Sequence, residues 1–143
     1  MRKPSSLRAA LEAALPSLAS DPDKLLVYAN KGRLVCTGVP GASFEYRYEL
    51  ELILTDCALD PDTIMVPVLT WLATEQPDAL ANYDASEKGI EFEADILSND
   101  TWDLSLKLPI TEAVVATLQA DGSTAITNPL EPPFDPEWQG VIG

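Results

Sequence analysis

The residues best placed to do chemistry are three carboxylates, Glu91, Glu93 and Asp95, which alternate along the segment 90–96. Alternate side chains of a β-strand project from the same face, so this spacing places the three together. Such a group can supply a carboxylate pair for acid–base catalysis or oxygen ligands for a hard cation. The same alternation is typical of the solvated face of a half-buried strand. The opposite face then carries four apolar residues: Ile90, Phe92, Ala94 and Ile96.

The rest of the sequence favours the solvated-face interpretation. The chain contains no histidine, the commonest general base near neutral pH and the commonest metal ligand. No glycine-rich loop or nucleophile motif accompanies the carboxylates. The segments Asp21-Pro22-Asp23 and Asp60-Pro61-Asp62 are typical of turns and helix caps, because they lack the spaced oxygens and central glycine of a calcium loop. We therefore expect no catalytic residue, no metal and no cofactor.

Three other residues are candidates for recognition. Arg47 lies in the alternating segment 44–54, where it could bind a phosphate or a partner carboxylate, or pair weakly with neighbouring acids in water. Phe134 and Trp138 lie in a proline-rich segment that cannot bury them locally, and we expect them to contact a neighbouring subunit.

The net charge of −14 is unevenly distributed. Residues 1–47 carry seven basic groups and four acids, whereas residues 48–106 carry fourteen acids and a single lysine. A surface that binds a DNA duplex must neutralise phosphates with Lys and Arg, so stable nucleic-acid binding is disfavoured. The basic third of one copy of the chain could instead meet the acidic middle of another.

The 143 residues suit one domain with a conventional core. Apolar periodicity predicts a helix from about Ser5 to Leu15 and a second one between the turn at Asp60-Pro61-Asp62 and Gln76-Pro77-Asp78. In this second helix, Pro67 should be tolerated only near the first turns. Alternation predicts a long strand over 44–54 and further strands over 90–96 and 102–110. Turn residues predict hairpins at 30–33 and at Asp121-Gly122.

These elements define an α+β fold, a mostly antiparallel sheet packed with about two helices. Residues 1–128 form its single domain, and the proline-rich residues 129–143 form an extended C-terminal arm. Both cysteines are expected to pack as reduced thiols. No apolar run approaches the roughly 20 residues that span a bilayer, and the N-terminus lacks a clean signal-peptide core, so export and membrane binding are not expected.

Short motifs in a fixed order resemble the tail-completion protein R family, tail terminators of peduovirus-type contractile phages. The resemblance runs to about residue 133. It rests on these segments: Lys3-Pro4, Ser6-Leu7-Arg8, Leu34-Val35, Thr37-Gly38, Glu45-Tyr46-Arg47-Tyr48, Pro67-Val68-Leu69, Trp71-Leu72, Gln76-Pro77-Asp78, Glu87-Lys88-Gly89, Phe92-Glu93, Asp95-Ile96-Leu97, Asn99-Asp100 and Glu131-Pro132-Pro133.

The resemblance implies a structural, non-enzymatic tail-terminator subunit, built in the host cytoplasm and retained at the neck-proximal end of the virion tail. Its partners would be copies of itself in a hexameric ring, the tail tube and sheath, and the neck or head-completion proteins. Glu91, Glu93 and Asp95 could then line the lumen and repel the passing genome. The alternatives are an acidic DNA mimic that inhibits a DNA-binding protein, an enzyme using paired carboxylates, or the equivalent collar subunit of a headless, phage-derived bacteriocin.

Overall fold

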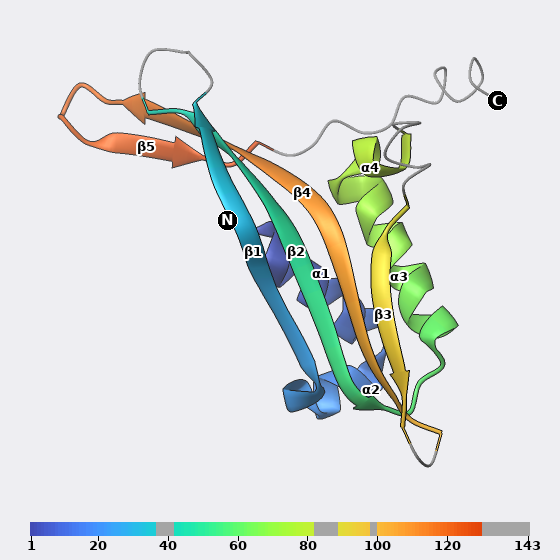
Figure 1. Cartoon of the computed structure of the whole chain (residues 1–143). Coiled ribbons are helices and arrows are strands. Elements are labelled where there is room, and N and C mark those ends of the chain that lie inside the picture. Colours follow the sequence, from blue (N-terminus) through green and yellow to red (C-terminus); the bar gives the residue numbers. More distant parts are fainter. Residues whose placement is uncertain (37–41, 82–88, 98–99, 130–143) are drawn as a thin grey trace, which may run out of the picture.

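The computed structural model describes residues 1–36, 42–81, 89–97 and 100–129. In this part of the chain, helices lie against one side of a twisted antiparallel sheet (Figure 1). The predicted α+β class is therefore confirmed. In chain order the elements are α1 (Lys3–Ala14), α2 (Pro16–Ser20), the 3-10 helix η1 (Pro22–Lys24), β1 (Leu25–Cys36), β2 (Phe44–Cys57), α3 (Pro61–Glu75), α4 (Pro77–Ala81), β3 (Glu91–Ile96), β4 (Trp102–Leu118) and β5 (Thr124–Thr127).

The sheet has the strand order β1-β2-β4-β3, with every neighbouring pair antiparallel. β1 and β3 are therefore its two edges. β4 continues past the sheet and pairs with β5, so that a two-stranded hairpin projects beyond the helices (Figure 1). The predicted turn at Asp121-Gly122 is confirmed, and Gly122 adopts a φ of 90°, which a glycine accepts without strain.

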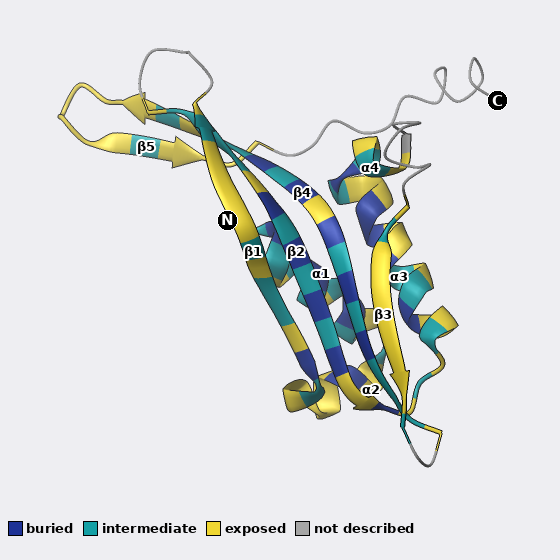
Figure 2. Ribbon diagram, in the orientation of Figure 1, coloured by how far each residue is buried: buried dark blue, intermediate teal, exposed yellow. Residues whose placement is uncertain are grey.

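The core lies between the sheet and the helices α1 and α3. The predicted alternation of β2 is confirmed, because Tyr48, Leu50, Leu52 and Leu54 are buried and the residues between them are not. β4 shows the same alternation, and the buried bands of the two strands lie side by side (Figure 2). The helices complete the core with these buried residues: Leu7, Leu11, Ile64, Val68, Trp71 and Leu72. We call the side of the sheet that faces the helices the inner face, and the opposite side the outer face.

The predicted hairpin turn at residues 30–33 is wrong, because β1 runs without a break from Leu25 to Cys36. Its register against β2 shifts between Asn30 and Arg33, where β1 uses one residue more than β2. Lys31, inside this bulge, has a φ of 52°. Glycine and asparagine favour bulges as well as turns, so their presence alone did not distinguish the two. The bulge reverses the alternation of the strand and places Arg33 opposite Arg47 on the outer face.

Two predictions about the helices also need correction. α1 begins at Lys3, earlier than the serines expected to cap it, because Glu112 from β4 accepts hydrogen bonds from the first amides. Pro67 lies in the interior of α3. The carbonyl that thereby loses its intrahelical partner belongs to Thr63, an exposed residue, so water can bond to it. Asp60 caps α3 by accepting from the Asp62 amide at 2.9 Å, as the turn-and-cap interpretation predicted.

The two cysteines differ in their surroundings. Cys57, at the end of β2, is buried in the core, as expected. Cys36, at the end of β1, is exposed and therefore does not pack as predicted. It belongs to the edge strand, on which no further strand of the described residues lies.

Candidate functional site

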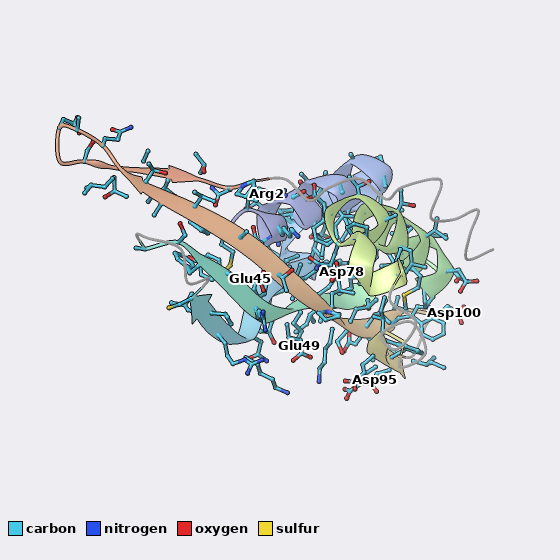
Figure 3. All side chains as sticks on the ribbon, turned by 90° about the horizontal axis from the view of Figure 1, so that it is seen from above. Arg2, Glu45, Glu49, Asp78, Asp95 and Asp100 are labelled. Carbon is cyan, nitrogen blue, oxygen red and sulfur yellow. The ribbon has the colours of Figure 1, made fainter. Side chains whose placement is uncertain are left out.

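The outer face of the sheet carries most of the predicted site residues. Register places Glu91, Glu93 and Asp95 of β3 on this face, because they lie opposite the outer-face residues of β4. The alternation that put the three carboxylates on one face is thus seen in the fold. Glu49 and Asp95 both lie on the side of the sheet away from the helices (Figure 3). Pairing aligns Glu51, Lys107 and Glu91 across three strands, so one lysine sits between two carboxylates.

Within the described parts of the chain, no group of three or more potential ligands is arranged to hold an ion. Asp95 lies directly opposite Asp103, whose Oδ1 accepts a hydrogen bond from the backbone N–H of Asp56 at 2.8 Å. The outer face of β3 is a solvated, acidic surface, because its three carboxylates are exposed.

The inner face of β3 differs from the prediction. All six residues of the strand are exposed, including Phe92 at 59% and Ile96 at 74% of their surface. The sequence predicted that this apolar side would be buried. Among the described residues, no helix and no strand covers it. Ile90, just before the strand, does pack against the core. β3 is thus an edge strand whose apolar and acidic sides are both open.

Arg47 lies on the outer face of β2 in a cluster that we call the basic corner, formed by Lys31, Arg33 and Arg47. Its Nε donates to Glu45 Oε1 at 2.6 Å, and Lys31 Nζ lies 3.7 Å from Glu49 Oε2. Arg47 therefore has an ion-pair partner on its own strand, and its contact with another subunit stays a prediction. The basic corner borders a shallow depression of about 780 Å³ that crosses the sheet toward Gln76 and Glu91.

A second polar group, which the sequence did not lead us to expect, is buried where α1, α3 and β4 meet. We call it the N-terminal cluster; it consists of Lys3, Tyr48, Gln76 and Glu112, all at most 6% exposed. Glu112 Oε1 accepts from the backbone N–H of Arg2 at 2.8 Å and of Lys3 at 3.2 Å, and its Oε2 accepts from the Tyr48 hydroxyl at 2.5 Å. A carboxylate at a helix N-terminus is stabilised by the unpaired amides there.

The ammonium group of Lys3 makes three further hydrogen bonds in the N-terminal cluster. Its Nζ donates to the backbone oxygens of Glu75 at 2.5 Å and Thr111 at 2.8 Å, and to Gln76 Oε1 at 2.8 Å. The first of these oxygens is at the C-terminus of α3, where a cation is favoured. Gln76 Oε1 also accepts from the Thr111 N–H at 3.2 Å, so Lys3 and Gln76 bond to the part of β4 that β3 does not reach.

Burial and the hydrogen bond to Glu112 raise the pKa of Tyr48 well above its ordinary value. The tyrosine is therefore a neutral donor throughout the physiological range. Each polar atom of the cluster is engaged in joining three elements, so its role is to fix the N-terminus in place. One signal in the sequence points to it: Glu112 occupies an apolar position in the alternation that runs along β4 from Leu104 to Val114.

The remaining candidates lie elsewhere. Phe134 and Trp138, and with them nearly all of the predicted arm at 129–143, lie outside the described residues. Trp71 is buried in the core, and its Nε1 donates to Ser6 Oγ at 3.0 Å. The projecting hairpin of β4 and β5 exposes three apolar side chains: Val115, Leu118 and Ile126. Among the described residues, no helix is long and apolar enough to cross a bilayer.

Comparison with known proteins identifies the class of protein to which this surface belongs. Residues 1–132 match the family described as P2 phage tail completion protein R (GpR). The chain is also 39% identical over 133 residues to "Tail completion protein R" of Escherichia phage P2, an alignment that covers 93% of this chain and 85% of that protein. No solved structure matches the chain. The chain belongs to the P2 phage tail completion protein R family, and the resemblance stated from its motifs is confirmed.

Proposed function

We propose that this protein completes the head-proximal end of a contractile phage tail, as a structural subunit of a hexameric ring. The observation that carries the proposal is its 39% identity, over 93% of its length, to tail completion protein R of phage P2. In this role the protein caps the tube and sheath and presents a surface for head joining. It is made in the host cytoplasm, stays in the virion tail and catalyses no reaction.

The exposed surfaces of the fold support a role in assembly. The apolar side of β3 and the tip of the β4–β5 hairpin expose large side chains that a solitary soluble protein would tend to bury. Copies of the same chain, tube and sheath subunits, and neck proteins are the partners that would cover them.

The experiment is a phage in which the gene for this protein is deleted and then supplied from a plasmid. We expect negative-stain images of the deletion to show tails of uncontrolled length, or tails that do not join heads, and the plasmid to restore both. Normal tails joined to heads in the deletion strain would contradict the proposal. The presence of capsid and packaging genes nearby separates a phage from a headless bacteriocin.

A second part of the proposal concerns the lumen of the ring. We propose that the outer face lines it, with Glu91, Glu93 and Asp95 among the carboxylates that repel the passing genome. Its support is the acidic surface of β2 and β3 on one side of the sheet.

The lumen is tested at Glu49 and Glu51, which share that face but lie on a central strand. Glu49→Lys with Glu51→Lys should slow DNA ejection or leave DNA bound in the tail, whereas Glu49→Gln with Glu51→Gln should have a smaller effect. Ejection at the normal rate from correctly assembled Lys-variant tails would remove this part of the proposal and leave tail completion standing.

A further inference from the structure

The two edges of the sheet carry opposite charge. β1 contains two basic residues, Lys31 and Arg33, and no acid, whereas β3 contains three acids and no base. Both sets lie away from the core, and the bulge in β1 is what brings Arg33 to the outer face, the face on which the β3 carboxylates lie. The basic edge and the acidic edge are thus on opposite sides of one subunit.

The apolar residues of the two edges also share a face. Leu34 of β1 lies opposite Tyr46, and Phe92 of β3 lies opposite Leu106, so both belong to the inner face. Leu34 is 65% exposed, close to the exposure of Phe92 and Ile96. If the two edges were joined, the exposed apolar residues would meet on one side of the ladder and the opposite charges on the other.

The directions of the edge strands allow β3 of one subunit to pair with β1 of the next in a ring. β1 and β3 run in opposite directions, because three antiparallel pairings separate them. Rotation about a ring axis that runs along the strands keeps each strand's direction, so β3 of one subunit meets β1 of the next as an antiparallel pair. The residues of β1 that lie level with β3 across the sheet, Leu25–Tyr28, carry no charge. The contact therefore requires β3 to be shifted by three residues or more along β1, so that Lys31 and Arg33 meet the carboxylates. The stagger between neighbouring strands of a closed sheet allows such a shift.

Charge also disfavours pairing between two like edges. Pairing of two β1 edges would oppose basic residues, and pairing of two β3 edges would oppose three acids with three acids. Both are destabilised by like-charge repulsion, whereas the mixed pair is attractive. The edges therefore disfavour a two-fold dimer and favour a head-to-tail contact between copies of the chain.

We infer that subunits join edge to edge, with β3 of one copy adding to β1 of the next to form a continuous sheet around the ring. The inference rests on the proposed ring and specifies the contact that closes it. It assigns Phe92, Ile96 and Leu34 to the interface, and Arg33 to the ion pairs that set its register.

The test reverses the charge of one edge at a time. The basic-edge variant carries Lys31→Glu and Arg33→Glu, and the acidic-edge variant carries Glu91→Lys and Glu93→Lys. All four residues are exposed, so circular dichroism should show folded chains. Sedimentation velocity and native mass spectrometry should show that each variant alone self-associates about tenfold or more weakly than the natural chain. A control with Asp23→Lys and Asp62→Lys raises the net charge by four, as the acidic-edge variant does, at exposed carboxylates outside both edges and should assemble normally.

Mixing provides the decisive measurement. In an equimolar mixture, the unaltered acidic edge of one variant faces the unaltered basic edge of the other, and the two reversed edges also attract. The mixture should therefore assemble although neither variant does. Assembly of each variant alone like the natural chain, or a mixture no better than its components, would overturn the inference.

Measurement inside the phage separates this inference from the proposed function. If the natural gene restores the deletion strain and both edge variants restore it equally well, the edge contact is wrong while tail completion stands. If the natural gene restores nothing, tail completion itself is wrong. When the inference is right, each variant alone fails to restore joined tails and the two expressed together succeed.

Discussion

The strands β2 and β3 belong to the same sheet, and apolar and polar residues alternate in both. The apolar side chains of β2 form part of the core, whereas those of β3 are exposed. In β2 the apolar residues from Tyr48 to Leu54 are buried beneath the helices, whereas Phe92 and Ile96 of β3 are more than half exposed. Alternation thus predicts a strand with an apolar face, but not which molecule covers that face. Four predictions test this contrast, from the largest expected effect to the smallest.

The largest effect is expected at the N-terminal cluster, which fixes the covered part of the sheet. Glu112→Ala removes the acceptor for the Tyr48 hydroxyl and two backbone amides, and takes the carboxylate out of the cluster that buries the Lys3 ammonium. We expect the free energy of unfolding, measured in urea, to fall by about 3–5 kcal/mol. Glu112→Gln, which keeps one acceptor oxygen, should lose less. Equal stability of Glu112→Ala and the natural chain would show that the cluster does not hold the fold.

A core truncation on β2 should have the next largest effect. Leu52 is fully buried between β1 and β4, so Leu52→Ala leaves a cavity that neighbours fill incompletely. We expect a loss of about 3 kcal/mol in the free energy of unfolding. A loss below about 0.5 kcal/mol would mean that β2 and β3 are equally open, and the contrast between them would disappear.

Alkaline pH should weaken the covered region through Tyr48. Its pKa is raised in the folded state, so the native chain keeps a proton that the unfolded chain releases above the ordinary tyrosine pKa of 10.0. The unfolded state then binds fewer protons, and the free energy of unfolding falls with rising pH, at about 1.4 kcal/mol per pH unit for one proton. Urea unfolding between pH 9 and 11 measures the slope. Tyr48→Phe should remove this contribution, and an unchanged slope in that variant would assign it to other groups.

The smallest effect on the isolated chain is expected at β3. Phe92→Ser changes a residue that is mostly exposed, so its free energy of unfolding should change by no more than about 0.5 kcal/mol. Its self-association, measured by sedimentation, should nevertheless weaken. Leu69→Ser, which changes an exposed apolar residue on α3, is the control for self-association and should leave it unchanged. A large loss of stability in Phe92→Ser would show that β3 is covered within its own subunit.

Much of the fold could be predicted from the sequence because its signals are local. The alternation of 44–54, the helix between Asp62 and Gln76 and the turn at Asp121-Gly122 each depend on neighbouring residues, and each is confirmed. The bulge in β1 was mistaken for a turn because the strand that pairs with it, β2, lies beyond it in the chain. Local composition does not reveal which partner a glycine-containing segment will meet.

The candidate site was predictable in part for the same reason. The shared face of Glu91, Glu93 and Asp95 follows from their spacing. The strand register places these residues on the outer face, on the side of the sheet away from the helices. The burial of Lys3 could not be predicted, because its partners are contributed by Gln76 and Thr111, which are distant in the chain. Glu112 could be noticed in the sequence as a carboxylate at an apolar position of the alternation. Its hydrogen-bond partner Tyr48, however, is known only from the fold.

The length of β4 has a mechanical consequence. The strand runs for 17 residues from the core into the projecting hairpin, about 55 Å of unbroken backbone. A pull on the turn at Asp121-Gly122 is therefore transmitted along this strand to the centre of the sheet. There the ladder with β2 lies parallel to the force, so its hydrogen bonds are loaded together in shear and not peeled apart one at a time.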